Sequence, residues 1–286
     1  MIPYGRQNIS QEDIDSVVTV LKSDNLTQGN NVPDFECNIA NYVGAKHAIA
    51  VNSATSALHI AYLALGIDNQ SRVWTTPITF VATTNAALMC GAQIDFVDID
   101  PETSNICPLA LESKLTAAEV DGDLPDLVVV VHLGGYSCDM KSIFKLSKKY
   151  NFKIVEDASH AVGGKFFEQY VGKCEYSDIT IFSFHPVKII TTGEGGAALT
   201  NDSSLAHKMA LLRSHGITRR NDEMTKTTDG PWYYQQHLLG FNYRMNDISA
   251  ALGVSQLKRL DEFVVERQSI ANRYNQYFRG TNVKTP

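Results

Sequence analysis

One lysine in the chain has a sequence setting suited to covalent chemistry. Lys188 lies between Val187 and the pair Ile189 and Ile190, and a glycine-rich turn follows at residues 192–196. An apolar environment disfavours the ammonium form and lowers the pKa of a lysine. A neutral lysine can form a Schiff base or act as a base, so Lys188 is a candidate catalytic residue. The alternative is an ordinary charged lysine on the surface.

Two adjacent carboxylates, Glu156 and Asp157, follow a short apolar strand predicted at residues 154–155. Side chains alternate across a strand, so one of the two carboxylates should face a site at the strand end. A carboxylate there can hold a heteroaromatic ring nitrogen in its protonated state. Asp157 could otherwise cap a helix or bind a metal ion.

A run of small and hydroxyl-bearing residues at positions 52–57 joins a short strand to a predicted helix. The free N–H groups and the positive dipole end of such a helix suit a phosphate monoester. Plain N-capping by Ser53 or Thr55 would explain the same residues.

A fourth polar segment, residues 239–247, carries the donors Asn242 and Arg244 just before a long helical pattern. The alternative here is a helix-entry turn capped by Asn246 or Asp247.

The elements that must position these segments follow an alternating βα pattern, which is typical of a mostly parallel sheet. Helices are expected at residues 11–22, at about 54–65, and as one continuous helix at about 246–278. The predicted strands lie near residues 48–51, 73, 94–97, 127–131, 154–155, 180–182 and 196–200, the last pairing with its predecessor. Ligands bind open α/β sheets at the carboxyl ends of the strands, so the polar segments should meet there.

The composition is that of an ordinary globular protein and excludes several classes of function. Of the 286 residues, 44% are hydrophobic and 20% charged, and the net charge of −6 predicts no nucleic-acid or membrane partner. No apolar run reaches membrane-spanning length and the first residues lack a signal peptide, so we expect a cytoplasmic protein. The five scattered cysteines are expected to be reduced, and the histidine spacing predicts no metal site.

The four segments together resemble the sugar aminotransferases of the DegT/DnrJ/EryC1/StrS family along nearly the whole chain. The stretches that carry this resemblance are residues 2–6, 26–29, 183–188, 192–196 and 241–245. The resemblance implies an α/β fold, the pyridoxal-phosphate (PLP)-dependent transferase fold type I, with a mostly parallel sheet flanked by helices. It also implies a PLP-dependent aminotransferase that acts on a nucleotide-linked keto-sugar.

The resemblance assigns roles to individual residues. Lys188 would carry the cofactor and move the proton during transfer, and Asp157 would pair with the pyridine nitrogen. The residues implied to bind the cofactor phosphate are Thr55, Ser56 and Ser183, and Ala54 is also implied to bind the cofactor.

Further positions are implied around the ring and the substrates. Phe80 would lie against one face of the ring, and His160 would lie near its hydroxyl group. Asn242 would reach the phosphate from a second subunit, which requires a homodimer with shared sites. The residues implied to bind the substrates are Tyr4, Thr27, His185 and Arg244, the last with the amino donor's carboxylate.

A finer resemblance points to the branch of the family that makes pseudaminic acid, and residues 1–7, 52–59, 183–190 and 232–236 carry it. It implies transfer of an amino group from L-glutamate, which leaves as 2-oxoglutarate, to C4 of a UDP-linked 4-keto-6-deoxy-N-acetylhexosamine. The alternatives are an aminotransferase for another nucleotide-linked keto-sugar and a non-catalytic regulatory relative.

The same resemblance divides the chain into two parts. Residues 1–245 would form the large PLP-binding domain, with an N-terminal arm at residues 1–30. Residues 246–286 would form a connecting helix and the start of a C-terminal small domain, which we expect to be largely missing.

Overall fold

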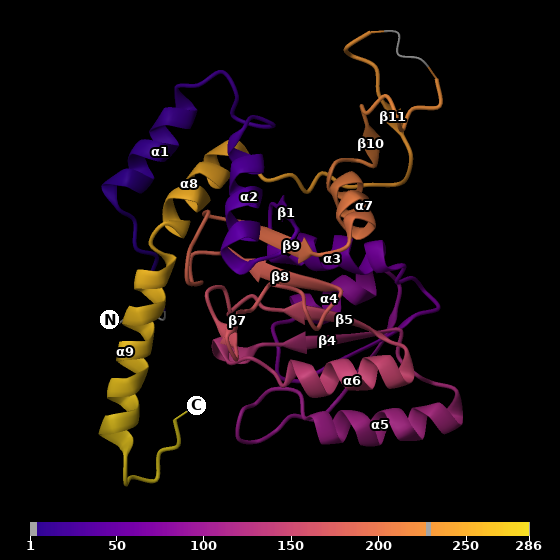
Figure 1. Cartoon of the computed structure of the whole chain (residues 1–286), viewed down its shortest axis with the longest axis vertical. Coiled ribbons are helices and arrows are strands. Elements are labelled where there is room, and N and C mark those ends of the chain that lie inside the picture. The colour runs from indigo at the N-terminus through magenta and orange to yellow at the C-terminus, as the bar shows by residue number, and fades with distance from the viewer. Residues whose placement is uncertain (1–4, 227–229, 286) are drawn as a thin grey trace.

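A seven-stranded sheet forms the centre of the molecule in the computed structural model, which describes residues 5–226 and 230–285 (Figure 1). The strand order is β1-β9-β8-β5-β4-β2-β3, and only β9 runs antiparallel to its neighbours. The sheet strands are β1 (His47–Val51), β2 (Arg72–Thr75), β3 (Gln93–Phe96), β4 (Leu127–Val131), β5 (Lys153–Asp157), β8 (Ile179–Ser183) and β9 (Gly196–Thr200). The expected α/β fold with a mostly parallel sheet is confirmed.

Helices cover both faces of this sheet. The helices are α1 (Gln11–Leu21), α2 (Asn31–Val43), α3 (Ala54–Leu65), α4 (Ala82–Met89), α5 (Pro108–Asp121), α6 (Met140–Tyr150), α7 (Ser203–Arg213), α8 (Asp247–Leu257) and α9 (Leu260–Phe278). Helices α3, α4 and α7 pack on one face, and α5 and α6 cover the β4–β5 region of the other (Figure 1). All five residues of β4 are buried, as expected for a strand covered on both sides.

Two short hairpins lie outside the main sheet. Strands β6 (Lys165–Phe166) and β7 (Gln169–Tyr170) form one, and β10 (Ile217–Thr218) and β11 (Gln235–Gln236) form the other. The β10–β11 hairpin projects from the body of the molecule beside α7 (Figure 1). Helix α9 projects from the opposite side of the body.

The prediction of one continuous helix over residues 246–278 was wrong. Helix α8 ends at Leu257 and α9 starts at Leu260, with Arg259 outside helical geometry at φ −107° and ψ 7°. The guanidinium of Arg259 donates to Asp13 Oδ2 (2.6 Å) and to Asn8 Oδ1 (3.1 Å). These contacts with the N-terminal segment hold the break in place.

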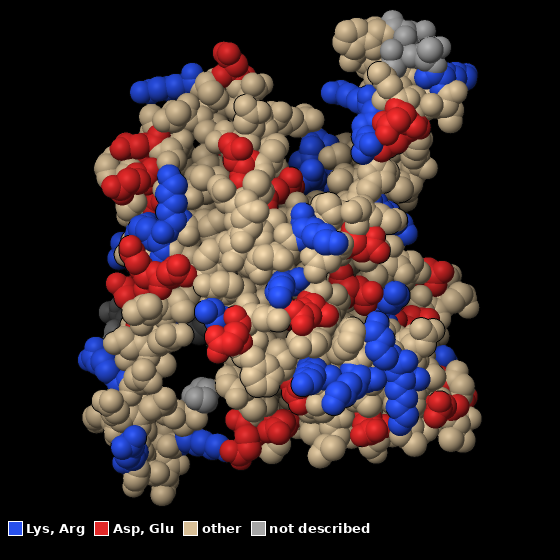
Figure 2. All heavy atoms as spheres, in the orientation of Figure 1, with Lys and Arg blue, Asp and Glu red and all other residues tan. Residues whose placement is uncertain are grey.

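The surface shows charges of both signs (Figure 2). Basic side chains gather over α6, which carries Lys141, Lys145, Lys148 and Lys149. Acidic side chains lie close by, and Lys149 pairs with Glu112 at 3.6 Å. This face therefore offers no extended field of one sign.

Candidate active site

The polar segments meet at the edge of the sheet formed by the carboxyl ends of β1, β5 and β8, because these three strands run in the same direction. Gly196, the first residue of β9, pairs with Val51 on one side and with Ser183 on the other. Asp157 ends the next strand, where it pairs with Ile181. The register therefore brings the start of α3, Ser183 and Asp157 to the same edge, as the strand-end rule predicted.

Ser53 caps helix α3, which decides the N-capping question left open by the sequence. Its hydroxyl accepts the Ser56 N–H at 3.1 Å, and the Ser56 hydroxyl donates to Asn52 Oδ1 at 2.7 Å. Thr55 is partly exposed and does not serve as the cap. The first N–H groups of a helix lack intrahelical partners, so this turn presents donors suited to a phosphate.

Gly196 lets β9 approach the first turn of α3 closely. A Cβ atom at this position would lie 2.5 Å from the Ala54 nitrogen and 2.7 Å from its Cα. These are backbone atoms that cannot move aside, so any side chain at position 196 would displace the helix start. The phosphate-binding arrangement predicted from residues 52–57 thus depends on a glycine about 140 positions later in the chain.

Asp157 is buried, and both of its carboxylate oxygens are held. Oδ2 accepts the Thr83 hydroxyl at 2.7 Å, and Oδ1 accepts the Ser159 hydroxyl at 2.6 Å. Its neighbour Glu156 bonds His132 instead, in a different set of contacts. Of the two carboxylates, Asp157 is therefore the one that faces the site. The sequence did not reveal Thr83, which comes from the first turns of α4.

Lys188 lies in the loop between β8 and β9 and is half-buried. Its N–H donates to the His185 carbonyl at 2.9 Å, which shapes the turn. Burial lowers the pKa of Lys188, and the negative charge of Asp157 raises it by less, so the net pKa is below the ordinary lysine value. The lowered pKa expected from the sequence agrees with this environment, although Val187 itself is 39% exposed.

His160 completes a cluster with Lys188 and Asp157. Burial lowers the pKa of His160, the charge of Lys188 lowers it further, and the charge of Asp157 raises it. The three groups therefore lie within electrostatic reach of one another. The imidazole Nδ1 accepts the Gly134 N–H at 3.3 Å, which assigns the proton of the neutral ring to Nε2.

Phe80 precedes α4 and is 72% exposed. Its carbonyl accepts the Thr83 N–H at 3.2 Å, so the segment that carries Phe80 is tied to the residue that holds Asp157. The aromatic ring is open to a ligand from this position, and its stacking role remains a prediction.

The segment that carries Asn242 and Arg244 runs beside β1. Arg244 forms an isolated bridge with Val51, and the Asn52 N–H donates to the Tyr243 carbonyl at 2.8 Å. Arg244 is thus placed next to the start of α3. Asn242 pairs through its backbone with Ser214 and has an exposed side chain. Asn246, and not Asp247, caps α8.

The other residues predicted to bind the substrates, His185 and Thr27, are exposed and lie in loops. His185 is exposed in the Lys188 loop, where its Nδ1 accepts the Val187 N–H at 3.4 Å. Thr27 is exposed in a turn that Asp247 holds by accepting the Gly29 N–H at 2.9 Å. No hydrogen bond among the described residues joins Thr27 to Lys188. Tyr4 lies outside the described residues.

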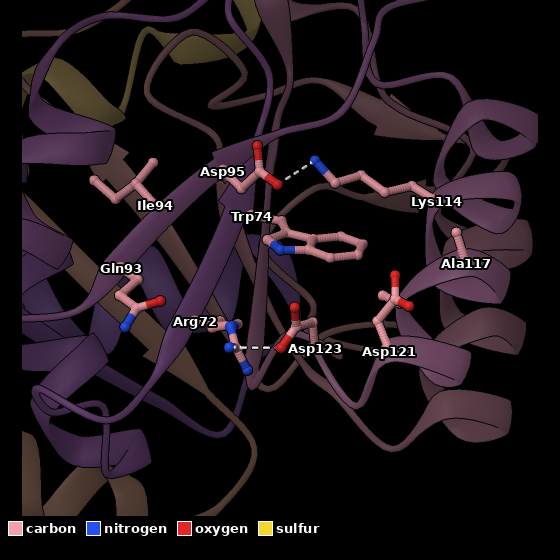
Figure 3. Close-up of a pocket in the computed structure, with 10 residues that line it drawn as sticks. Arg72, Trp74, Gln93, Ile94, Asp95, Lys114, Ala117, Asp121 and Asp123 are labelled. Atoms are coloured by element: carbon pink, nitrogen blue, oxygen red, sulfur yellow. Dashed lines mark ion pairs between the residues drawn. The ribbon is translucent and has the colours of Figure 1, made fainter.

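A separate hollow of about 360 Å³ lies away from these residues, beside α5 and the N-terminal ends of β2 and β3 (Figure 3). Two ion pairs border it, Arg72 with Asp123 and Lys114 with Asp95, both at 2.6 Å. The Lys114 ammonium also lies 4.7 Å from the ring centroid of Trp74. None of the predicted site residues lines this hollow, so it is distinct from the strand-end site.

Residues 5–226 and 230–285 contain neither a metal-binding cluster nor a membrane-spanning helix. This part of the chain holds no group of three or more His, Cys, Asp or Glu side chains arranged to bind a metal ion. None of its helices combines the length and the apolar character needed to cross a lipid bilayer.

Known proteins resemble this chain over nearly its whole length. Residues 7–286 match the model of the DegT/DnrJ/EryC1/StrS aminotransferase family. The UDP-4-amino-4,6-dideoxy-N-acetyl-β-L-altrosamine transaminase of Campylobacter jejuni strain 81-176 is 45% identical over 278 residues, which are 97% of this chain and 70% of that protein.

Solved structures of aminotransferases have the same fold. Helicobacter pylori PseC, an aminotransferase of pseudaminic acid biosynthesis, superposes with a TM-score of 0.87 at 35% identity, covering 98% of this chain and 71% of that one. The PLP form of the sugar aminotransferase Spr1654 from Streptococcus pneumoniae superposes with a TM-score of 0.85 at 27% identity, covering 98% and 72%. The chain therefore belongs to the DegT/DnrJ/EryC1/StrS aminotransferase family.

Proposed function

We propose that this aminotransferase binds PLP at Lys188 and aminates C4 of a UDP-linked 4-keto-6-deoxy-N-acetylhexosamine in pseudaminic acid biosynthesis. L-Glutamate is the amino donor and leaves as 2-oxoglutarate. The observation that carries the proposal is the register of the sheet, which brings Asp157, Ser183 and the first turn of α3 to the same strand ends, with Lys188 in the loop that follows Ser183.

The residues at the strand ends fit the cofactor. The first turn of α3, seated on Gly196, offers backbone donors to the phosphate, with Thr55 and Ser183 beside it. Asp157 is buried with a fixed carboxylate, which suits a protonated pyridine nitrogen. Lys188 has the lowered pKa that covalent attachment to an aldehyde requires.

The chemistry divides between the cofactor and the protein. PLP, when bound, supplies an aldehyde that takes up an amino group and an electron-poor ring that stabilises negative charge at the reacting carbon. Lys188, freed when the donor binds, accepts a proton from one carbon and returns it to another through Nζ, which must be neutral to act as a base. Asp157 keeps the ring nitrogen protonated, and His160 lies beside both groups.

The substrate part of the proposal rests on the relatives. The Campylobacter relative is named as a transaminase of a UDP-linked amino sugar, and PseC is described as an aminotransferase of pseudaminic acid biosynthesis. Both matches cover nearly the whole of this chain. The proposed homodimer rests on Asn242, whose exposed side chain is free to reach the phosphate in a second subunit.

The first test is the visible absorption spectrum of the purified protein with added PLP, recorded before and after L-glutamate. We expect a yellow band that bleaches with glutamate in the wild-type protein. Lys188→Ala should give neither the attached band nor turnover. A colourless wild-type protein would contradict the assignment of PLP as the cofactor and of Lys188 as the lysine that binds it. That result is the one expected of a non-catalytic relative.

A second test addresses the acceptor. The aminated protein should regain its yellow band when the UDP-linked 4-keto sugar is added, and mass spectrometry should find the amino sugar. Recovery with a keto-sugar on another nucleotide, but not with the UDP sugar, would replace the proposed substrate and keep the aminotransferase assignment.

A further inference from the structure

A buried polar cluster lies next to Asp157 and has no part in the proposed chemistry. Glu156 is 5% exposed and His132, the first residue after β4, is fully buried. A buried charge is costly unless its hydrogen bonds are satisfied, so such a cluster calls for an explanation.

Glu156 accepts three hydrogen bonds. Thr180 donates to Oε1 at 2.8 Å, the Ser177 hydroxyl donates to the same oxygen, and His132 Nε2 donates to Oε2 at 2.7 Å. Burial raises the pKa of Glu156, but these donors lower it by more, so the carboxyl remains ionised.

The geometry also fixes the proton on His132. The Cys138 N–H donates to His132 Nδ1 at 3.1 Å, and a backbone N–H can only donate. Nδ1 therefore carries no proton, and Nε2 carries the one that reaches Glu156. Burial lowers the pKa of His132, but Cys138 and Glu156 raise it to about 10, which favours a second proton on the ring. That proton would point at the Cys138 N–H, which can only donate. We assign the neutral form, with the ring held at both nitrogens.

His132 connects this buried pair to two site residues. Its backbone N–H donates to the Asp157 carbonyl at 3.1 Å. The turn that follows it, Leu133–Gly135, donates the Gly134 N–H to His160 Nδ1 at 3.3 Å. The turn also packs tightly, because a Cβ on Gly135 would lie 2.8 Å from the His160 carbonyl oxygen.

We propose that His132, anchored by the buried Glu156, is a positioning residue that sets Asp157 and His160 around the cofactor ring. This proposal rests on the proposed function. His132 does not touch the ring; its backbone N–H holds the Asp157 carbonyl, and the turn that follows it holds the His160 imidazole through the Gly134 N–H. Glu156 fixes its ring from the buried side.

The test uses the PLP dissociation constant and the pH midpoint of the visible band of the bound cofactor. His132→Ala should raise the dissociation constant about tenfold, because losing the imidazole's bonds to Glu156 and to the Cys138 N–H loosens the turn whose backbone holds Asp157 and His160. The pH midpoint of the band should rise by about one pH unit. A ring nitrogen that is held less firmly in its protonated form withdraws less electron density from the bond between the cofactor and Lys188. His132→Gln, whose amide can still donate to Glu156, should restore part of both effects.

His59→Ala is the matched control. His59 is also buried at 4% exposure, and its Nδ1 lies 3.2 Å from the Tyr243 hydroxyl. This variant should lower the melting temperature of the cofactor-free protein but leave the midpoint unchanged. If His132→Ala lowered the melting temperature in the same way and left both cofactor readouts at wild-type values, its role would be purely structural and the inference would be wrong.

A milder variant covers the case in which His132→Ala does not fold. Ser177→Ala removes one donor to Glu156 at a partly buried position and should move the midpoint in the same direction by less; no movement would overturn the inference. A wild-type protein that binds no PLP would instead refute the proposed function, so the two failures can be told apart.

Discussion

The pKa of Lys188 is set by two opposing effects, burial and the charge of Asp157. Above its lowered pKa the lysine is neutral and nucleophilic, so in the cofactor-free protein it should react with acetic anhydride at lower pH than the exposed lysines of α6. Asp157→Asn removes the charge that raises this pKa, and the midpoint should therefore fall further. Peptide mass spectrometry across a pH series measures both midpoints, and a higher midpoint in Asp157→Asn would contradict this account.

The hydroxyl of Thr83 should matter for cofactor binding, whereas that of its neighbour should not. Thr83→Val removes the 2.7 Å bond to Asp157 Oδ2 and should weaken PLP binding about tenfold, since a hydrogen bond to a charged group contributes about 1.5–3 kcal/mol. Thr84→Val is the matched control, because that hydroxyl bonds only the Val81 carbonyl on an exposed surface. Equal affinities in fluorescence titrations of the two variants would speak against the role of Thr83.

The sequence points to the side chains proposed to act on the cofactor, but not to the side chains that hold them. Lys188 and Asp157 stand out because each combines a reactive group with an adjacent apolar strand or loop. Thr83 contacts Asp157 across 74 positions, and a threonine in a helix has no local feature that reveals such a contact. His132 was overlooked for the same reason, although Glu156, its partner, was noticed beside Asp157.

The contact between β9 and the first turn of α3 predicts a specific effect of Gly196→Ala. The added Cβ would meet the Ala54 backbone at 2.5 Å and push the helix start away from the sheet. We expect PLP and inorganic phosphate to bind at least about tenfold more weakly, because the donors of the first turn lose their alignment.

Gly122→Ala provides the control for this variant. Gly122 ends α5 at φ 74°, far from α3, so alanine there strains the backbone by roughly 1 kcal/mol without touching the phosphate site. It should lower the melting temperature and leave phosphate affinity unchanged. If Gly196→Ala behaved the same way in calorimetry, the close approach would serve folding alone.

Element positions were predicted well where the pattern is local, and the failure at α8 and α9 has a physical cause. Leu257 and Leu260 continue the helical apolar spacing across the break, so periodicity alone gives one helix. The break depends on Arg259 reaching Asn8 and Asp13, about 250 residues earlier in the chain. Helix α1, expected over residues 11–22, starts at Gln11 after the capping box that Ser10 and Asp13 form, a local contact.

At the scale of the whole molecule, the parallel sheet explains why segments more than a hundred residues apart share one edge. Three segments lie at the strand ends on that edge, namely residues 51–56, 157–160 and 183–196. Asn242 differs, because its own chain places its backbone beside Ser214 and leaves its side chain exposed. A role at the phosphate then requires a second copy of the chain.

This requirement predicts complementation between two inactive variants. Lys188→Ala destroys the lysine of its own site, and Asn242→Ala removes the donor offered to the partner's site. In a mixed dimer, one of the two sites combines an intact Lys188 with an intact Asn242 from the other chain. Random pairing of equal amounts should therefore restore about a quarter of wild-type activity, since half of the dimers are mixed and each has one working site. Each variant alone serves as the control, and a mixture as inactive as its components would mean that Asn242 does not act across subunits.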